Sequence, residues 1–163
     1  MPKVNFILDP DTAKQYEIDR VPAVAIVGQD EAGRERDSKI RFLGAPAGYE
    51  FMSLIQAVLL VGGRPSMLSE ESLKLIAGVQ TPTTVHVFTT PTCPHCPRAV
   101  VVAHEMAFAN PNITAFAVEA TEFPDLARKY AVTGVPKTVV NDTVEILGAL
   151  PPDAFVSQAL GGT

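Results

Sequence analysis

The chemistry of this chain centres on two cysteines three positions apart. Cys93 and Cys96 are the only cysteines among the 163 residues, and they lie in the sequence TCPHC. One such pair can form and break a disulfide locally, but it is too few for a disulfide-stapled secreted fold. The apolar run Thr84–Thr89 precedes the pair and a helical pattern follows it. We therefore expect Cys93 to cap a helix and Pro94 to take the first helical position.

The place of each cysteine relative to this helix predicts its role. Free N–H groups and the helix dipole favour the thiolate of Cys93, and His95 adds an effect of the same sign if it is protonated or donates a hydrogen bond. Cys96 lies about one turn deeper and keeps a more ordinary thiol. We predict that Cys93 is the attacking or leaving sulfur, that Cys96 resolves the mixed disulfide, and that Pro94 and His95 tune the pair to be relatively oxidising.

A zinc site is the alternative use of such a pair. Two cysteines supply half of a tetrahedral site, and the remaining ligands would have to be His86, His95 or His104. His104 follows Cys96 by eight residues, about two helical turns, and cannot share one ion with it. There is no second cysteine pair, so we expect no metal. His86 and His104 are expected to be ordinary, partly exposed residues.

Val135-Pro136 is a second candidate element, directly before the expected strand Lys137–Asn141. Only X-Pro bonds adopt the cis form at low cost. If this bond lies beside Cys93, the free backbone groups of Val135 can pair with an extended substrate peptide. A proline that simply starts a strand is the alternative interpretation.

Composition excludes several classes of protein. The chain is 47% hydrophobic and 19% charged, which excludes an extended disordered protein. A net charge of −5 argues against nucleic acid as a partner. No apolar run approaches the roughly 18 residues that span a bilayer, so no membrane partner is expected. The start, Met1–Asp9, is too weakly apolar for a signal peptide, which favours a cytoplasmic location. A strand so close to Met1 raises the question of an upstream segment.

The strands and helices expected from the sequence fall into two groups along the chain, which we call the first and second series. A short helix capped by Ser69 joins them. We expect residues 1–63 to be a partial unit without redox cysteines, 64–82 a linker helix, and 83–163 a complete unit. The first series has strands Val4–Leu8, Ala23–Val27 (buried on both faces) and Lys39–Leu43, with helices near residues 9–16 and at Tyr49–Val61. The second has strands Thr84–Thr89, Ile113–Val118, Lys137–Asn141 and Thr143–Leu147, with helices Cys93–Ala109, Glu122–Tyr130 and Pro152–Leu160.

The two series are an internal repeat. The segment Tyr16–Pro22 matches Tyr130–Pro136 in the spacing of the tyrosine, a β-branched residue and Val-Pro. Each Val-Pro precedes a strand, a turn, a second strand that ends in Leu-Gly, and a helix. Relative to the second series, the first lacks its opening strand and helix.

These motifs resemble a known family. TCPHC at a strand-to-helix turn, with VPK about forty residues later, resembles the thioredoxin and glutaredoxin fold, an α/β fold with three layers and a mixed central sheet. Nearly the whole chain is similar to the glutaredoxin-like protein disulfide oxidoreductases, which join two such units. The segments that carry this likeness are YEIDRVPA, IRFLGAPAGYEF, FTTPTCPHCPRAVVVAHEMA and VEATEFPDLARKYAVTGVPKTVV. The tandem amino-terminal region of peroxiredoxin reductases has a similar layout.

The resemblance implies a thiol–disulfide oxidoreductase that acts on proteins through a Cys93 mixed disulfide, with Cys96 resolving and Pro136 in the cis form. It implies no cofactor beyond the Cys93–Cys96 disulfide. Its partners would be protein disulfides or dithiols and a reductase or thiol donor. Three alternatives stay open. The chain could be an electron relay to a peroxiredoxin or a docking module for a partner chain. It could also be a glutathione-using glutaredoxin, although Arg98 is the only cationic residue near the motif that could bind the glutathione carboxylates.

Two departures from the family affect the expectations. The missing strand would lie between Val4–Leu8 and Ala23–Val27, and its absence would leave unpaired backbone groups inside a sheet. We therefore expect either an incomplete chain or a strand from another chain, with an oligomer through the first unit. The buried carboxylate of thioredoxins is Val87 here, so water or Glu119 must take the proton from Cys96.

Overall fold

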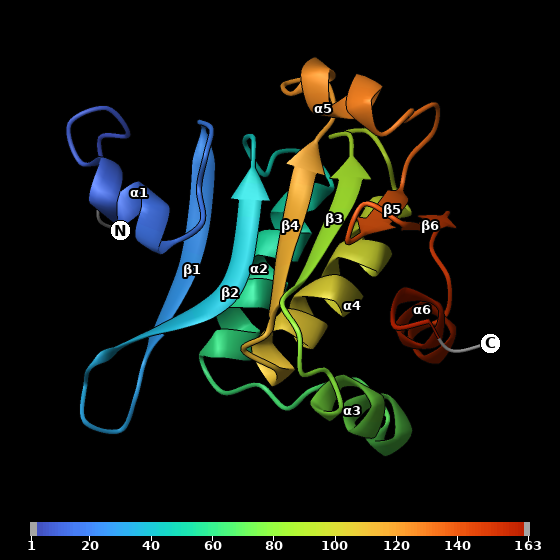
Figure 1. The fold of residues 1–163 in the computed structure, drawn as a ribbon, viewed down its shortest axis with the longest axis horizontal. Helices are drawn as coiled ribbons and strands as arrows, with labels where there is room; N and C mark the ends of the chain where they lie inside the picture. Colours follow the sequence, from blue (N-terminus) through green and yellow to red (C-terminus); the bar gives the residue numbers. More distant parts are fainter. Residues whose placement is uncertain (1–2, 162–163) are drawn as a thin grey trace.

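A mixed sheet with helices on both faces organises the computed structural model, which describes residues 3–161 (Figure 1). Its six strands run in the order β1-β2-β4-β3-β5-β6. The strands are β1 (Ala23–Gln29), β2 (Glu35–Leu43), β3 (Thr83–Thr89), β4 (Ile113–Glu119), β5 (Lys137–Val140) and β6 (Val144–Leu147). The helices are α1 (Pro10–Gln15), α2 (Glu50–Val61), α3 (Glu70–Ala77), α4 (Cys96–Ala109), α5 (Pro124–Lys129) and α6 (Pro152–Ala159). Parallel pairing of β2 with β4 joins both halves of the chain into one sheet. The expected fold class is confirmed.

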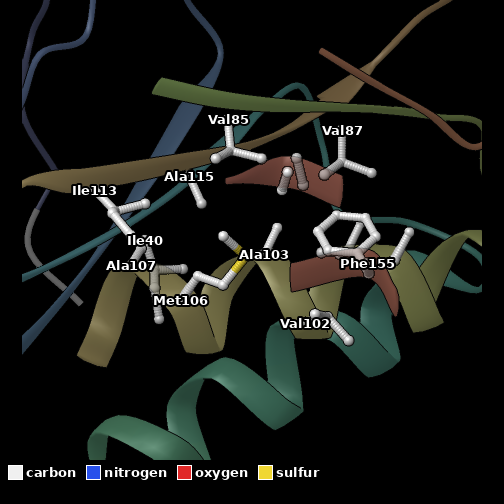
Figure 2. Packing of buried hydrophobic residues seen from close by; sticks show 14 of the residues in the cluster. Ile40, Val85, Val87, Val102, Ala103, Met106, Ala107, Ile113, Ala115 and Phe155 are labelled. Atoms are coloured by element: carbon white, nitrogen blue, oxygen red, sulfur yellow. The ribbon is translucent and has the colours of Figure 1, made fainter. Parts of the chain in front are cut away.

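The two faces of the sheet carry two separate hydrophobic cores, because side chains alternate along each strand. One face packs against α2, α4 and α6, where Val85 and Ala115 meet Met106 and Phe155 (Figure 2). The opposite face packs beneath α5 and includes a buried Phe88. The central strand β4 is buried along its whole length, as expected for a parallel strand covered on both sides.

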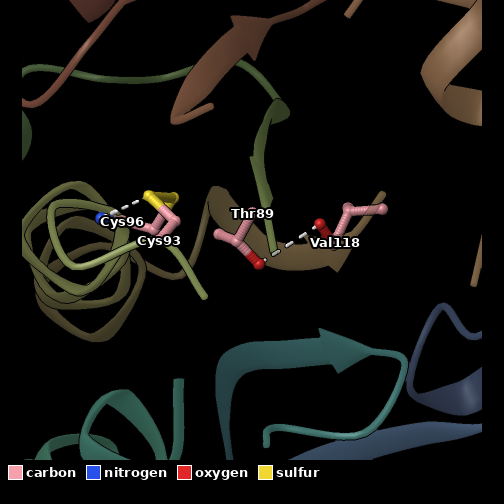
Figure 3. The surroundings of a disulfide bond; sticks show 4 residues. All are labelled: Thr89, Cys93, Cys96 and Val118. Atoms are coloured by element: carbon pink, nitrogen blue, oxygen red, sulfur yellow. Dashed lines mark hydrogen bonds between the residues drawn. A yellow bond between two sulfur atoms is a disulfide. The ribbon is translucent and has the colours of Figure 1, made fainter. Parts of the chain in front are cut away.

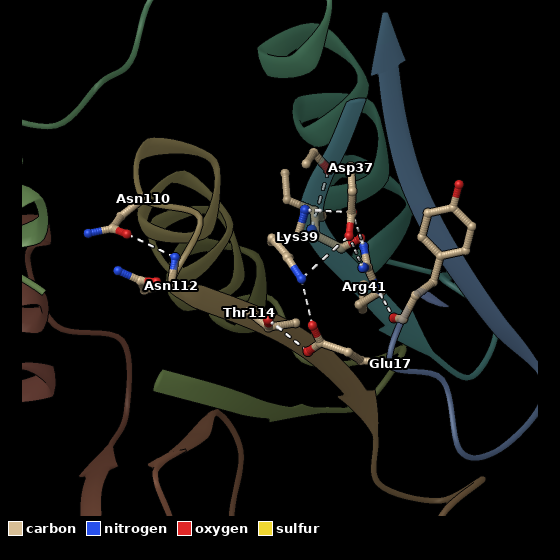
Figure 4. Close-up of polar contacts among 10 residues, drawn as sticks. Glu17, Asp37, Lys39, Arg41, Asn110, Asn112 and Thr114 are labelled. Atoms are coloured by element: carbon tan, nitrogen blue, oxygen red, sulfur yellow. Dashed lines mark hydrogen bonds and ion pairs between the residues drawn. The ribbon is translucent and has the colours of Figure 1, made fainter. Parts of the chain in front are cut away.

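A buried arginine attaches the end of α1 to the α5 face of the sheet (Figure 4). The Arg41 side chain is fully buried and donates to the carbonyl of Tyr16 at 2.6 Å and to both carboxylate oxygens of Asp37 at 2.8 and 2.7 Å. Glu17, which follows Tyr16 in the chain, accepts a 2.9 Å hydrogen bond from the hydroxyl of Thr114 on β4. Buried charge is tolerated here because it is paired and hydrogen-bonded.

The structure confirms the internal repeat. Both Val21-Pro22 and Val135-Pro136 are cis. The N–H of Gly44 donates to Pro22 at 2.8 Å, and that of Gly148 donates to Pro136 at 2.9 Å. The residue after each repeat tyrosine has a positive φ, 58° at Glu17 and 47° at Ala131. The cis-proline strand, its hairpin partner and the following helix therefore occur twice: β1, β2 and α2, then β5, β6 and α6.

The expected strand Val4–Leu8 is wrong. The side-chain oxygen of Asn5 accepts hydrogen bonds from the N–H groups of Ile7 and Leu8, both at 3.0 Å, and folds this segment into a turn. A strand needs a neighbour to satisfy its backbone groups, and no described residue supplies one here. The predicted gap inside a sheet is therefore wrong as well, because β1 is the outermost strand. The expectation that Ala23–Val27 is buried on both faces also fails, since Ile26, at 8% exposed, is the one buried residue of β1.

The segment between the halves is tied to α4 through Glu105. This carboxylate is 2% exposed and accepts hydrogen bonds from Arg64 and from the N–H of Met67, both at 2.8 Å, and from Ser66. The division at residues 63 and 82 stays a prediction. Among residues 3–161, no helix is long and apolar enough to cross a membrane.

Candidate redox site

Cys93 and Cys96 form a disulfide whose Cα atoms are 5.5 Å apart, within the usual range for such bonds (Figure 3). Cys93 is 8% exposed and Cys96 is completely buried. An incoming sulfur can therefore reach only Cys93, which agrees with the predicted difference in depth.

The loop that carries the cysteines is fixed to the end of the sheet. β3 ends at Thr89, which pairs in register with Glu119 on β4. The hydroxyl of Thr89 donates to the carbonyl of Val118 at 3.4 Å (Figure 3), and the N–H of Cys93 donates to the carbonyl of Thr90 at 3.1 Å. Cys93 is therefore held close to the carboxyl end of a central strand.

The helix behind the disulfide begins later than expected. α4 starts at Cys96, so Pro94 does not take its first position, and Pro97 lies in the first turn. Pro97 has no N–H to donate to the carbonyl of Cys93, which prevents a regular helical bond from starting there. The sulfur of Cys93 still accepts the N–H of Cys96 at 3.1 Å, as a capping side chain does. This contact favours negative charge on Cys93 in the direction that the sequence predicts.

Register places the cis proline at the same end of the sheet. β5 pairs antiparallel with β3, with Phe88 opposite Lys137, so Pro136 lies across from Thr89. Val135 is half-buried, and among the described residues its backbone N–H and carbonyl make no backbone hydrogen bond. The structure thus brings Val135-Pro136 to the sheet end from which the Cys93 loop leaves.

The cysteine-free half of the chain forms one wall of the site. The N–H of Tyr49 donates to the carbonyl of Pro91 at 3.0 Å. Gly48, with a φ of +59°, approaches Pro91 so closely that a Cβ would lie 2.1 Å from the Pro91 carbonyl oxygen. Only glycine fits this position, because it combines a left-handed conformation with a close backbone approach.

Glu50, at the start of α2, is a buried carboxylate beside the cysteine loop that sequence reasoning missed. It is 3% exposed, and among the described residues neither carboxylate oxygen has a hydrogen-bond partner. Burial raises the pKa of Glu50 to about 7. Glu50, Thr89, Pro91 and Glu119 line a cavity of about 10 Å³, close to the volume one water needs. The sequence feature that could have identified Glu50 is its place as a carboxylate in the helix Tyr49–Val61, which is otherwise apolar nearly all round.

Glu119 lines the same cavity, but unlike Glu50 its carboxylate accepts several hydrogen bonds. Its oxygens accept the hydroxyl of Thr121 at 2.8 and 2.7 Å and the N–H of Glu122 at 2.6 Å. These hydrogen bonds orient the Glu119 carboxylate towards the loop after β4. Glu50, whose pKa is raised by burial, is the carboxylate better suited to take up a proton near neutral pH.

His86 and His104 lie apart from this chemistry, whereas His95 stands between the two cysteines as the exposed residue before α4. His104 is only 2% exposed, which corrects the expectation of a partly exposed residue, and its ring meets Phe42 edge-on at 4.9 Å. Burial lowers the pKa of His104 to about 3 and that of His86 to about 4. His86 is half-buried and stacks on Phe116. Within residues 3–161, no three His, Cys, Asp or Glu side chains are grouped to hold a metal ion.

Known proteins share this sequence and fold. Residues 83–161 match the model of a thioredoxin domain. The chain is 33% identical over 132 residues to the alkyl hydroperoxide reductase F protein of Pseudomonas putida, an alignment that covers 76% of this chain and 25% of that protein. It therefore spans about a quarter of the length of this relative.

Solved structures extend the likeness to both halves. The alkylhydroperoxide reductase protein AhpF of Enterococcus faecalis superposes with a TM-score of 0.81 at 28% identity, over 91% of this chain and 69% of that one. A protein disulfide oxidoreductase from Aeropyrum pernix gives a TM-score of 0.82 at 30% identity, over 93% of this chain and 64% of that one. Together with the buried cysteine pair, these matches show that residues 83–161 are a thioredoxin domain and that both halves of the chain are similar to thioredoxin-fold disulfide oxidoreductases.

Proposed function

We propose that this chain exchanges disulfides with protein substrates through a mixed disulfide at Cys93. The observation that carries the proposal is the difference in depth between the two cysteines, since Cys93 keeps 8% of its surface exposed and Cys96 keeps none. Only one sulfur can meet a bulky substrate, and only the other is placed to release it.

In the reducing direction, the reaction begins with both cysteines reduced. The Cys93 thiolate attacks a substrate disulfide, forms a bond to one substrate sulfur and releases the other as a thiolate. Cys96 then loses its proton and attacks the Cys93 sulfur, which releases the second substrate thiolate and forms the Cys93–Cys96 disulfide. Two electrons pass to the substrate. A reductase or thiol donor restores the dithiol, and the reverse sequence oxidises a substrate dithiol.

Glu50 is the proposed acceptor of the Cys96 proton. A group with a pKa near 7 can both accept and return a proton at neutral pH. Glu50 directly follows Tyr49, which is bonded to the loop that leads into Cys93, and it lines the same cavity as Pro91. The cysteine-free half thus supplies the carboxylate that Val87 cannot provide.

The Val135-Pro136 segment is the proposed contact for substrate backbone. Its free N–H and carbonyl lie at the sheet end next to the cysteine loop. An extended peptide can pair with them as one more strand while its cysteine approaches Cys93.

Trapping with single cysteine variants tests this assignment. With a model protein disulfide as substrate, Cys96→Ser should accumulate a covalent complex that thiol reagents dissolve, whereas Cys93→Ser should form none. Mass spectrometry should locate the bond at Cys93. Trapping through Cys96, or full turnover by both variants, would overturn the proposal.

The relatives favour one narrower version of this function. Two of the similar proteins are components of alkyl hydroperoxide reductases, so the disulfide would relay electrons from a flavin reductase to a hydroperoxide-reducing partner. Rapid transfer from the reductase to that partner, with negligible reduction of a generic protein disulfide, would support the relay. Equal rates with both acceptors would support the general oxidoreductase.

A further inference from the structure

Lys137 is a buried cation that directly follows the cis proline at position 136. It is only 4% exposed, a place that a lysine takes in folded proteins only when its charge is paired. Its Nζ donates to the carbonyl of Tyr130 at 2.6 Å and lies 3.0 Å from a carboxylate oxygen of Glu145. Lys137 pairs in register with Phe88, so its side chain lies on the α5 face of the sheet. The buried ammonium therefore joins the start of β5 to the end of α5.

The carbonyl of Tyr130 needs a donor from outside the helix. Tyr130 is the residue at which α5 ends, and the last carbonyls of a helix have no partner within it. The helix dipole also favours a cation at this end. The rest of Tyr130 is fixed independently, because its hydroxyl donates to Asp142 at 2.5 Å and its ring centre lies 5.5 Å from that of Phe88. Lys137 is thus bonded to an anchored residue.

The segment between Tyr130 and Lys137 has little other support. The N–H of Val132 still donates back into α5. Beyond it, residues 133–135 make no backbone hydrogen bond within the part of the chain that the structure describes. The upstream end of the segment is therefore held by α5 and the downstream end by the sheet. The bond from Lys137 to Tyr130 sets the spacing between these ends, and with it the position of Val135.

The first half of the chain holds the matching carbonyl with a different residue. Tyr16 ends α1 as Tyr130 ends α5, and its carbonyl accepts a 2.6 Å hydrogen bond from the fully buried Arg41. Arg41 belongs to β2, whereas Lys137 belongs to β5, which matches β1 in the repeat. Ala23 takes the place of Lys137 in the first half. The contact between a buried cation and this carbonyl is therefore present twice, although the residues that supply the cation are not equivalent.

We propose that Lys137 is a positioning residue that holds Val135 where a substrate backbone can pair with it. The inference rests on the proposed function, in which Val135 is the contact for the substrate. Without the ammonium, the carbonyl of Tyr130 is left buried and unpaired, and the segment shifts to bring it to a new donor. The N–H and carbonyl of Val135 then move away from the substrate strand. The loss falls on disulfides in proteins and spares small disulfides, which have no backbone to pair.

Kinetics of Lys137→Met test the proposal. With insulin as the protein disulfide, the KM should rise about five-fold or more, as expected when one hydrogen bond to the substrate is lost. The reduced variant should react with cystamine, a small disulfide without a peptide backbone, at the rate of the parent protein. A KM equal to that of the parent, or equal losses with both disulfides, would overturn the proposal. A parent protein that reacts with cystamine but not with insulin would overturn the proposed function itself, and this inference with it.

Two further variants separate positioning from stability. Arg41→Met breaks the matching contact at Tyr16, in the half without cysteines, so it should lower stability to urea and leave the KM for insulin unchanged. A raised KM in this control would show that destabilisation alone is responsible and would refute the proposal. Lys137→Gln serves if Lys137→Met does not fold. Its side chain keeps a polar donor but is one atom shorter than lysine, so the bond to Tyr130 is lost and the KM should rise as well. A folded Lys137→Gln with the KM of the parent would contradict the assignment.

Discussion

The backbone N–H of Tyr49 donates a 3.0 Å hydrogen bond to the carbonyl of Pro91, and this contact joins the cysteine-free half of the chain to the loop that carries Cys93. The contact is backbone to backbone, so side-chain chemistry does not reveal it. It gives the first half a role in the redox site even though it holds no cysteine. Pro91, and with it the Cys93 loop, cannot move without disturbing the start of α2.

We predict that Gly48→Ala changes the reactivity and the redox equilibrium of Cys93, although Gly48 has no side chain to take part in the reaction. A Cβ at Gly48 would lie 2.1 Å from the Pro91 carbonyl oxygen, so the loop before Cys93 must shift. The rate at which reduced Cys93 reacts with an alkylating reagent should change several-fold, and so should its equilibrium with glutathione.

Gly33→Ala is the matched control. Gly33 also has a positive φ, +75°, but a Cβ there would meet nothing within 4 Å. This variant should cost about 1 kcal/mol in backbone strain and leave Cys93 reactivity unchanged. Equal effects of both substitutions on Cys93 would show that general destabilisation, and not the Pro91 contact, is responsible.

We predict that Glu50→Gln slows the resolving step and removes an inflection in its pH dependence. In the parent protein the step should accelerate as pH rises through about 7, where Glu50 ionises. The variant should be slower by at least a factor of about 100, the usual size of general base catalysis. Stopped-flow release of a substrate thiol from the mixed disulfide measures it. If Glu119→Gln, and not Glu50→Gln, removes the inflection, the proton acceptor is Glu119.

The same residue makes stability depend on pH. The unfolded chain ionises Glu50 near its ordinary pKa of 4.5, whereas the folded protein holds the proton up to about 7. The folded state therefore binds more protons between these values, and the free energy of unfolding falls as pH rises through this window. The loss should approach about 3 kcal/mol at pH 8 and be absent in Glu50→Gln. Urea titrations at pH 5 and pH 8 measure it.

Local patterns in the sequence predicted the cysteine pair and the repeated Val-Pro segments. The cysteine pair, the two Val-Pro segments and the Leu-Gly strand ends each depend on residues close together in the chain, so spacing alone identified them. The later start of α4 could also have been predicted from the sequence. Pro97 cannot donate a hydrogen bond to the carbonyl of Cys93, and these two residues are only four positions apart.

Long-range contacts set the limit of what those patterns predict. Val4–Leu8 has the composition of a strand, but a strand exists only where another strand pairs with it. Glu50 stands in the sequence as one polar residue in an apolar helix. Its burial follows from the contact of Tyr49 with Pro91, more than forty positions away in the chain. No local pattern contains that contact.

We predict that His104 makes the protein sensitive to acid. Its pKa is lowered to about 3 by burial, so the folded state excludes a proton that the unfolded chain binds below about 6.5. The unfolded state therefore binds more protons in this window, and stability falls as pH drops from 6.5 towards 3. His104→Leu should flatten this part of the stability profile, measured by urea unfolding at several pH values. His95→Leu, at an exposed position, should leave it unchanged.

We predict that Arg41→Lys weakens the fold although it keeps the charge. Arg41 uses its planar group to donate to both oxygens of Asp37 and to the carbonyl of Tyr16. A lysine ammonium cannot make this set of bonds from one position, and a buried acceptor is left unpaired. The cost should be about 1–3 kcal/mol in urea unfolding. Arg128→Lys, at an exposed site on α5, is the control and should change stability by less than about 0.5 kcal/mol. Equal stability of Arg41→Lys and the parent protein would show that charge alone fixes α1 to the sheet.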